Sequence, residues 1–127
     1  MIINIPSSFG ELLDKVSILL IKKNIITEPD KLIHINNELS KLQSVLNSTG
    51  ISKIKIEEYI NELKEINVKL WNIEDEIREC EKNNFFEDKF IQLARSVYKF
   101  NDQRAKIKLK INREFDSEIV EVKSYKG

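Results

Sequence analysis

The fold is decided by residues 53–82, which read KIKIEEYINELKEINVKLWNIEDEIRECEK. Apolar residues in this stretch follow alternating steps of three and four, a spacing that places side chains on one face of an α-helix. They are Ile56, Tyr59, Leu63, Ile66, Leu70, Ile73, Ile77 and Cys80. Thirty residues at 1.5 Å per residue predict a helix about 45 Å long.

A second long helix is predicted from about Glu87 to Phe115, after a break at Asn83-Asn84. Its apolar residues also share one face, and they are Phe90, Leu93, Val97, Phe100, Ile107, Ile111 and Phe115. Only a few residues separate the two stretches, so the two helices must run antiparallel as a hairpin.

Two shorter helices are predicted before this hairpin. The first begins at a capping box formed by Ser8 and Glu11 and runs to about Ile26. Its apolar residues nearly encircle it, which is typical of a helix at the centre of a bundle or in an oligomer interface. The second has Thr27 as its N-cap and Pro29 in its first turn. It carries a narrow, coiled-coil-like seam of Leu32, Ile35, Leu39, Leu42 and Leu46, and it ends at Asn47–Gly50.

Both ends of the chain read as extended segments. Residues 1–6 precede the first helix, and Ser117–Lys126 alternate between apolar and polar side chains, so this tail could pair with Ile2–Ile5. The predicted fold class is therefore all-α. We expect a helical bundle with a long antiparallel helical hairpin, two shorter helices and short extended termini, in a single domain over residues 1–127.

Composition narrows the classes of partner. The chain has 21 Lys and Arg against 21 Asp and Glu, and zero formal charge argues against a nucleic-acid binder that neutralises phosphates. No stretch is apolar enough to span a membrane, and the first residues lack a signal-peptide layout. The single cysteine cannot form an internal disulfide. We therefore expect a cytoplasmic protein with neither nucleic acid nor membrane as a partner.

No catalytic motif is recognisable. Three glycines exclude a glycine-rich phosphate loop. His34 lies opposite the seam of its helix, and a zinc site needs several nitrogen or sulfur ligands. Cys80 occupies a seam position and reads as a small buried hydrophobic residue. The sequence therefore assigns no catalytic residue and no cofactor, and it leaves open whether the protein is an enzyme.

The candidate functional residues are polar residues that interrupt the apolar stripes. They are Glu11, Asp14, Lys15, Asn67, Glu74, Arg78, Asn101, Arg104 and Lys108. Burying such charges singly costs several kcal/mol each, so they must pair or line a wet cavity. Arg104 lies at the centre of its stripe, and we expect its counter-ion on the first helix, at Glu11 or Asp14. The cluster is either an ion network that fixes helix register or a ligand pocket.

Several strings resemble an uncharacterised family of short helical proteins from bacteria and bacteriophages, known as a domain of unknown function. They are GELLDK at residues 10–15, LWNIEDEIR at 70–78, ARSVYKFNDQRA at 94–105 and VEVKSY at 120–125. The resemblance covers almost the whole chain. It implies a single all-helical domain with a short extended tail, and it implies no reaction, substrate or catalytic residue.

Two functions fit these observations. The first is a non-catalytic helical interaction or assembly module, which forms a homodimer or binds a protein partner. The apolar seams, the neutral charge and the lack of a recognisable nucleophile or base favour it.

The alternative is a magnesium-dependent hydrolase, or a binder of an anionic, nucleotide-like ligand in the bundle. Paired carboxylates would hold Mg²⁺ and cations would neutralise phosphate, and the candidates are Glu11, Asp14, Glu74, Asp75, Arg78, Arg104 and Lys108. This pattern departs from that of all-α nucleoside triphosphate pyrophosphohydrolases, which carry ExxE and then ExxD on successive helices. Glu74 and Asp75 are adjacent, so on a helix they point about 100° apart and cannot easily face one site.

Overall fold

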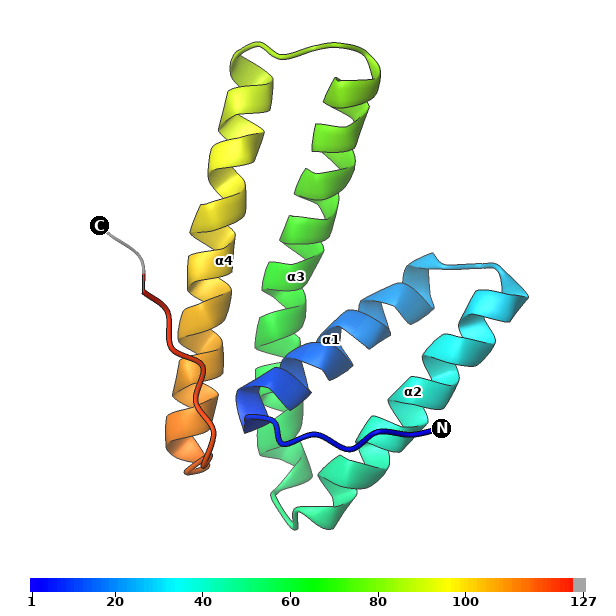
Figure 1. Ribbon diagram of the computed structural model, residues 1–127, viewed down its shortest axis with the longest axis vertical. Coiled ribbons are helices and arrows are strands. Elements are labelled where there is room, and N and C mark those ends of the chain that lie inside the picture. Colours follow the sequence, from blue (N-terminus) through cyan, green and yellow to red (C-terminus); the bar gives the residue numbers. More distant parts are fainter. Residues whose placement is uncertain (125–127) are drawn as a thin grey trace.

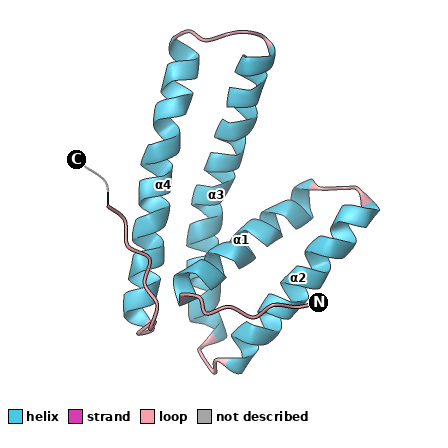
Figure 2. Cartoon of the chain, viewed as in Figure 1, coloured by secondary structure: helices cyan, strands magenta, loops and turns pink. Residues whose placement is uncertain are grey.

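The computed structural model describes residues 1–124, which form four helices (Figure 1). These are α1 (Phe9–Ile25), α2 (Pro29–Ser48), α3 (Lys53–Lys82) and α4 (Asp88–Glu114). Loops and turns connect them, and residues 1–124 contain no strand (Figure 2). The predicted all-α bundle is confirmed, and each helix begins and ends within a residue or two of its predicted bounds.

The hairpin of α3 and α4 forms the long axis of the molecule (Figure 1). The two helices run antiparallel and are joined by residues 83–87. Asn84 has a φ of 53°, a left-handed conformation that asparagine adopts more easily than most residues. The Asn83-Asn84 break therefore ends α3 and reverses the chain.

α1 lies across the base of the hairpin and packs against all three other helices. Its Leu13 and Val16 belong to one core cluster with Leu63 of α3 and Ile111 of α4. Buried residues lie on several sides of α1, which explains why its apolar residues nearly encircle it. The predicted central position of this helix is confirmed.

α2 packs against α1 and lies beyond it, away from α4 (Figure 1). Its seam residues Ile35, Leu39 and Leu46 are buried as expected. The predicted N-cap is wrong: Glu28, not Thr27, is the capping position, and its side chain makes no capping hydrogen bond. Pro29 is the cause, because a residue before proline is held in the extended region, and Glu28 has φ −66° and ψ 123°.

The termini do not pair with each other. Residues 1–7 run past the start of α1 towards α2, whereas residues 117–124 follow α4 on the other side of the molecule (Figure 1). The predicted strand pairing of Ile2–Ile5 with the tail is therefore wrong for the described residues, because the tail is held by contacts with α4 instead. Residues 125 and 126 of the predicted tail lie outside the described residues.

Within residues 1–124, no third helix covers the outer part of the hairpin. We call residues 71–99 the distal hairpin; they lie beyond the level at which α1 crosses α3 (Figure 1). In α4 the buried residues are Lys108, Ile111 and Asn112, all near its C-terminal end. In α3, Cys80 is the one buried residue beyond Leu70. The seam that α3 and α4 form is thus only half-buried over much of its length.

Candidate functional site

The carboxylate of Asp14 is the centre of the buried polar cluster, and its side chain is fully buried in α1. The Nε atom of Arg104 donates to both carboxylate oxygens, at 3.0 and 3.1 Å, and Nη2 donates to Oδ2 as well. The hydrogen bond with Asp14 is the main cause that raises the pKa of Arg104 above its ordinary value. The counter-ion expected on the first helix is therefore Asp14.

Asn67 of α3 completes the surroundings of this ion pair. Its Nδ2 atom donates to Asp14 Oδ1 and to Ser17 Oγ, each at 2.9 Å. Ser17 Oγ in turn donates to the main-chain oxygen of Asp14 at 2.7 Å. Sequence reasoning missed Ser17, although a polar residue three positions after Asp14 on an otherwise apolar helix is a usable signal. The carboxylate on α1 is thus held by side chains from the two other helices of this cluster, Asn67 of α3 and Arg104 of α4.

Lys108 forms a second ion pair closer to the start of α1. Its Nζ lies 2.6 Å from Glu11 Oε2 and 3.0 Å from Glu121 Oε2 in the tail. Burial would lower the pKa of Lys108, but the hydrogen bonds to the two carboxylates outweigh it and raise the pKa. Glu121 was missed because no periodic pattern places an extended tail against a particular helix.

The first turn of α1 is fastened directly to the end of α4. The main-chain N–H of Gly10 donates to Asn112 Oδ1 at 2.7 Å, and that of Phe9 donates to Ser117 Oγ at 3.1 Å. These bonds satisfy N–H groups that have no partner within a helix. A Cβ atom at Gly10 would lie 2.6 Å from the main-chain oxygen of Lys108. Only glycine permits this approach of the two backbones.

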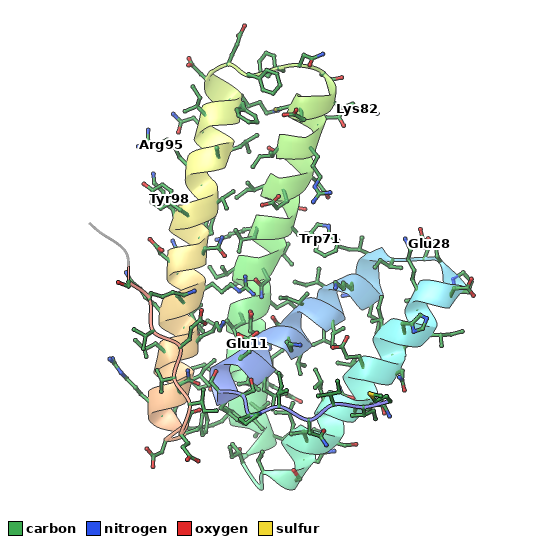
Figure 3. The ribbon with its side chains drawn as sticks, viewed as in Figure 1. Glu11, Glu28, Trp71, Lys82, Arg95 and Tyr98 are labelled. Atoms are coloured by element: carbon green, nitrogen blue, oxygen red, sulfur yellow. The ribbon has the colours of Figure 1, made fainter. Side chains whose placement is uncertain are left out.

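The remaining predicted site residues lie at the surface. Lys15 is exposed on α1 and takes no part in the described network. Asn101 is exposed and accepts from Arg104 Nη1 at 3.4 Å. Glu74 and Arg78 are exposed, and with Arg104 they line an open pocket of about 430 Å³ beside Trp71. Figure 3 shows Trp71 projecting from α3 near the end of α1.

The acidic pairs proposed for magnesium lie in different surroundings. Asp14 and Glu11 are bonded to Arg104 and Lys108. Glu74 and Asp75 both line the open pocket, so the expectation that these adjacent residues cannot easily face one site is wrong. Among residues 1–124, no three His, Cys, Asp or Glu side chains are grouped to hold a metal ion. Every buried side-chain nitrogen and oxygen atom of this part of the chain has a hydrogen-bond partner. The magnesium-dependent alternative stays a prediction, and the geometry gives it no support.

Lowering the pH from 4.5 to about 2 is expected to release the tail from α4. Hydrogen bonds from Lys123 and Lys108 lower the pKa of Glu121 from 4.5 to about 2. Because this pKa is lowered in the folded state, the attachment contributes fully above pH 4.5 and is lost as the pH falls through about 2. Amide NMR shifts of residues 117–124 would report the release, and Glu121→Gln should show the released shifts at pH 7.

An exposed neighbour provides the control for this titration. Glu118→Gln removes a carboxylate from the same tail and should leave the shifts at pH 7 unchanged. A transition of the tail centred near pH 4.5 in the wild-type chain would show that Glu121 is not held by Lys108.

A family model described as "Family of unknown function (DUF6165)" matches residues 2–127, so the chain belongs to this family. The match agrees with the expected membership of a family of unknown function, and the bacterial and bacteriophage origin stays a prediction. No curated protein and no solved structure matches the chain. None of the helices described for residues 1–124 is long and apolar enough to cross a membrane.

Proposed function

We propose that this member of the DUF6165 family is a non-catalytic assembly module that forms a homodimer through its distal hairpin. The observation that carries the proposal is the missing third layer. From Asp88 to Ile107, α4 contains no buried residue, although its seam is rich in large apolar side chains. A helix whose apolar face is left partly exposed over this many residues is typical of a partner-binding surface.

The uncovered surface continues the face on which α1 packs. Arg104 faces α1, and helical spacing places Val97, Ala94 and Phe90 on the same side of α4, at seven, ten and fourteen residues before it. On α3, Asn67 faces α1, and the residues four, seven and eleven positions later share that side. We call this surface the open face; it comprises Trp71, Glu74, Arg78, Phe90, Ala94 and Val97.

Charge favours a second copy of the chain as the partner. The distal hairpin contains seven carboxylates and five cations, so it has no strong excess of one sign that would repel its own copy. Among the residues that the structure describes, no ion pair joins α3 to α4 within the distal hairpin. These charges are therefore available to a partner of mixed charge.

Steric constraints favour an antiparallel two-fold dimer. α1 packs on both α3 and α4 at the base of the open face, so a second hairpin can lie on this face only beyond α1. An antiparallel partner keeps its own α1 at the opposite end, where the first hairpin has its tip. Two-fold symmetry then buries the same surface on both copies.

The buried polar cluster supports this assignment by holding α1 in place. Asp14 and Glu11 neutralise Arg104 and Lys108, and every buried side-chain nitrogen and oxygen atom of the described residues already has a hydrogen-bond partner. The cluster fixes α1 against the hairpin, as buried polar groups fix register in helical assemblies. α1 therefore forms a fixed edge of the open face at the base of the hairpin.

Ala94→Glu is expected to dissociate the dimer while leaving the fold intact. Ala94 is exposed in the single chain, and glutamate is a good helix former, so the substitution disturbs only the pairing. Two-fold symmetry would bury two added carboxylates of like charge in the interface, and we expect the dissociation constant to rise about 100-fold. Sedimentation velocity over a concentration series measures the change, and far-UV circular dichroism checks the helix content.

Gln92→Glu is the matched control, because it adds the same charge two residues away. Gln92 lies about 200° around the helix from Ala94, on the side away from the open face. A wild-type chain that sediments as a monomer at high micromolar concentration would overturn the proposal. Equal dissociation constants for Ala94→Glu and Gln92→Glu would do the same.

A further inference from the structure

We infer that the pocket beside Trp71 receives the aromatic tip of the second copy, formed by its Phe85 and Phe86; this inference rests on the proposed dimer. The pocket lies where the second half of α1 meets α3. Its apolar wall consists of Ile18 and Ile21 of α1 with Leu70 and Trp71 of α3. Glu74, Asp75 and Arg78 of the distal hairpin complete its lining along α3.

The tip is an exposed aromatic pair in a polar loop. Phe85 and Phe86 lie between Asn83-Asn84 and Glu87, and these two residues are 41% and 47% exposed. The ring of Phe86 meets that of Phe90 edge-on, with centroids 5.3 Å apart, so its position is fixed against α4. Large aromatic side chains presented in this way are typical anchors of protein interfaces.

The length of the distal hairpin brings the tip to the pocket. From Trp71 to Lys82, α3 rises about 17 Å, and from Phe86 to Tyr98 the returning chain covers about 18 Å. In an antiparallel dimer that uses the whole open face, the tip of one copy therefore reaches the level of Trp71 in the other. The end of α1 blocks any further sliding at that level.

The same register produces a packed centre. When Phe86 of one copy lies level with Tyr98 of the other, the two-fold axis passes at the level of residue 92, midway between them in α4. Phe90 of one copy then lies opposite Ala94 of the other. A large side chain then faces a small one, as well-packed helix interfaces require. At the outer end, Phe86 lies at the height of the second copy's Tyr98 and close to its Trp71.

The pocket has the chemistry to hold an aromatic side chain. Half-buried Trp71 supplies an aromatic face, and Ile21 supplies a buried aliphatic floor. Arg78 at the rim makes no described ion pair, so its guanidinium is available to stack on an inserted ring. Insertion of two phenylalanines also removes both exposed rings from water.

Cross-linking of two different variants tests the contact directly. Ile18→Cys places a thiol in the pocket wall, and Phe86→Cys places one at the tip. A mixture of the two chains should form a disulfide-linked heterodimer on oxidation, seen on a non-reducing gel. Ile33→Cys mixed with Phe86→Cys is the control and should give no such product, because Ile33 is exposed on α2, away from the pocket.

Trp71 supplies a second readout, since it is the only tryptophan of the chain. Acrylamide should quench its fluorescence less in the dimer than in the dilute monomer. Phe85→Ala/Phe86→Ala should abolish this protection and raise the dissociation constant about 100-fold, as expected for the loss of two aromatic anchors. Ile33→Ala/Ile54→Ala, which truncates two exposed isoleucines outside the distal hairpin, should change neither value.

The outcomes separate this inference from the dimer itself. A wild-type chain that is monomeric in sedimentation overturns both. Suppose that the chain is a dimer and that Ala94→Glu dissociates it. If Ile18→Cys and Phe86→Cys then form no cross-linked product, and Phe85→Ala/Phe86→Ala keeps the protection of Trp71, the tip contact alone is overturned. The cross-linked product together with lost protection supports both.

Discussion

Arg104→Leu is expected to destabilise the fold by about 3 kcal/mol. The carboxylate of Asp14 is fully buried, and Arg104 donates to it through Nε and Nη2. The substitution therefore removes the cation that neutralises this carboxylate. The hydrogen bond from Asn67 would remain, but one neutral donor does not compensate an isolated buried charge. Urea unfolding measures the loss of unfolding free energy. All variants are compared at one protein concentration, because dimerisation adds to the apparent stability.

Two further variants separate a lost ion pair from a general loss of packing. Asp14→Asn combined with Arg104→Leu removes the stranded charge and should recover part of the loss. Arg113→Leu makes the same chemical change at an exposed position of α4 and should stay within about 0.5 kcal/mol of wild type. If Arg104→Leu were as stable as Arg113→Leu, the ion pair with Asp14 would have no role in holding the fold.

Gly10→Ala is expected to cost about 2 kcal/mol or more, although alanine is the better helix former by about 1 kcal/mol. The added Cβ would lie 2.6 Å from the main-chain oxygen of Lys108 and 3.0 Å from Asn112 Oδ1. A backbone oxygen inside a helix cannot turn aside, so α1 must move away from α4. That movement also weakens the hydrogen bond from the Gly10 N–H to Asn112.

Chemical denaturation of Gly50→Ala provides the comparison. Gly50 has a φ of 71°, and a Cβ atom added there would have no neighbour within 4 Å, so its substitution carries only the backbone cost of about 1 kcal/mol. Asn112→Ala should lose the hydrogen bond without the clash, and it should not rescue Gly10→Ala, because the contact with Lys108 persists. A Gly10→Ala chain as stable as wild type would show that α1 and α4 can separate at no cost.

The periodic part of this fold was predictable because helical faces are a local property. The three-four spacing of Ile56 to Cys80 predicted the bounds of α3, and the position of Arg104 within its stripe indicated a partner on the first helix. Helical geometry fixes which side chains share a face, independently of what covers that face. The central place of α1 followed in the same way from its encircling apolar residues.

The parts that could not be predicted depend on contacts between distant, non-periodic segments. Glu121 reaches Lys108 from an extended tail, and Asn112 accepts from Gly10 across the interface of α1 and α4. Spacing along the sequence says nothing about such pairs. Glu74 and Arg78 follow Asn67 on its side of α3, yet they are exposed whereas Asn67 is buried against α1, and only the crossing position of α1 explains the difference.

The fastening of α1 to α4 also determines when the chain can fold during its synthesis. Arg104 follows Asp14 by 90 residues, and Asn112 follows Gly10 by 102. At roughly 5–20 residues per second, the ribosome needs on the order of 5–20 s to add the arginine after the aspartate. During this interval α1 and α2 can associate, but the carboxylate of Asp14 must stay in water. The side of α1 that carries Asp14 therefore cannot be buried until α4 has been made, and its apolar neighbours stay exposed to aggregation during this interval.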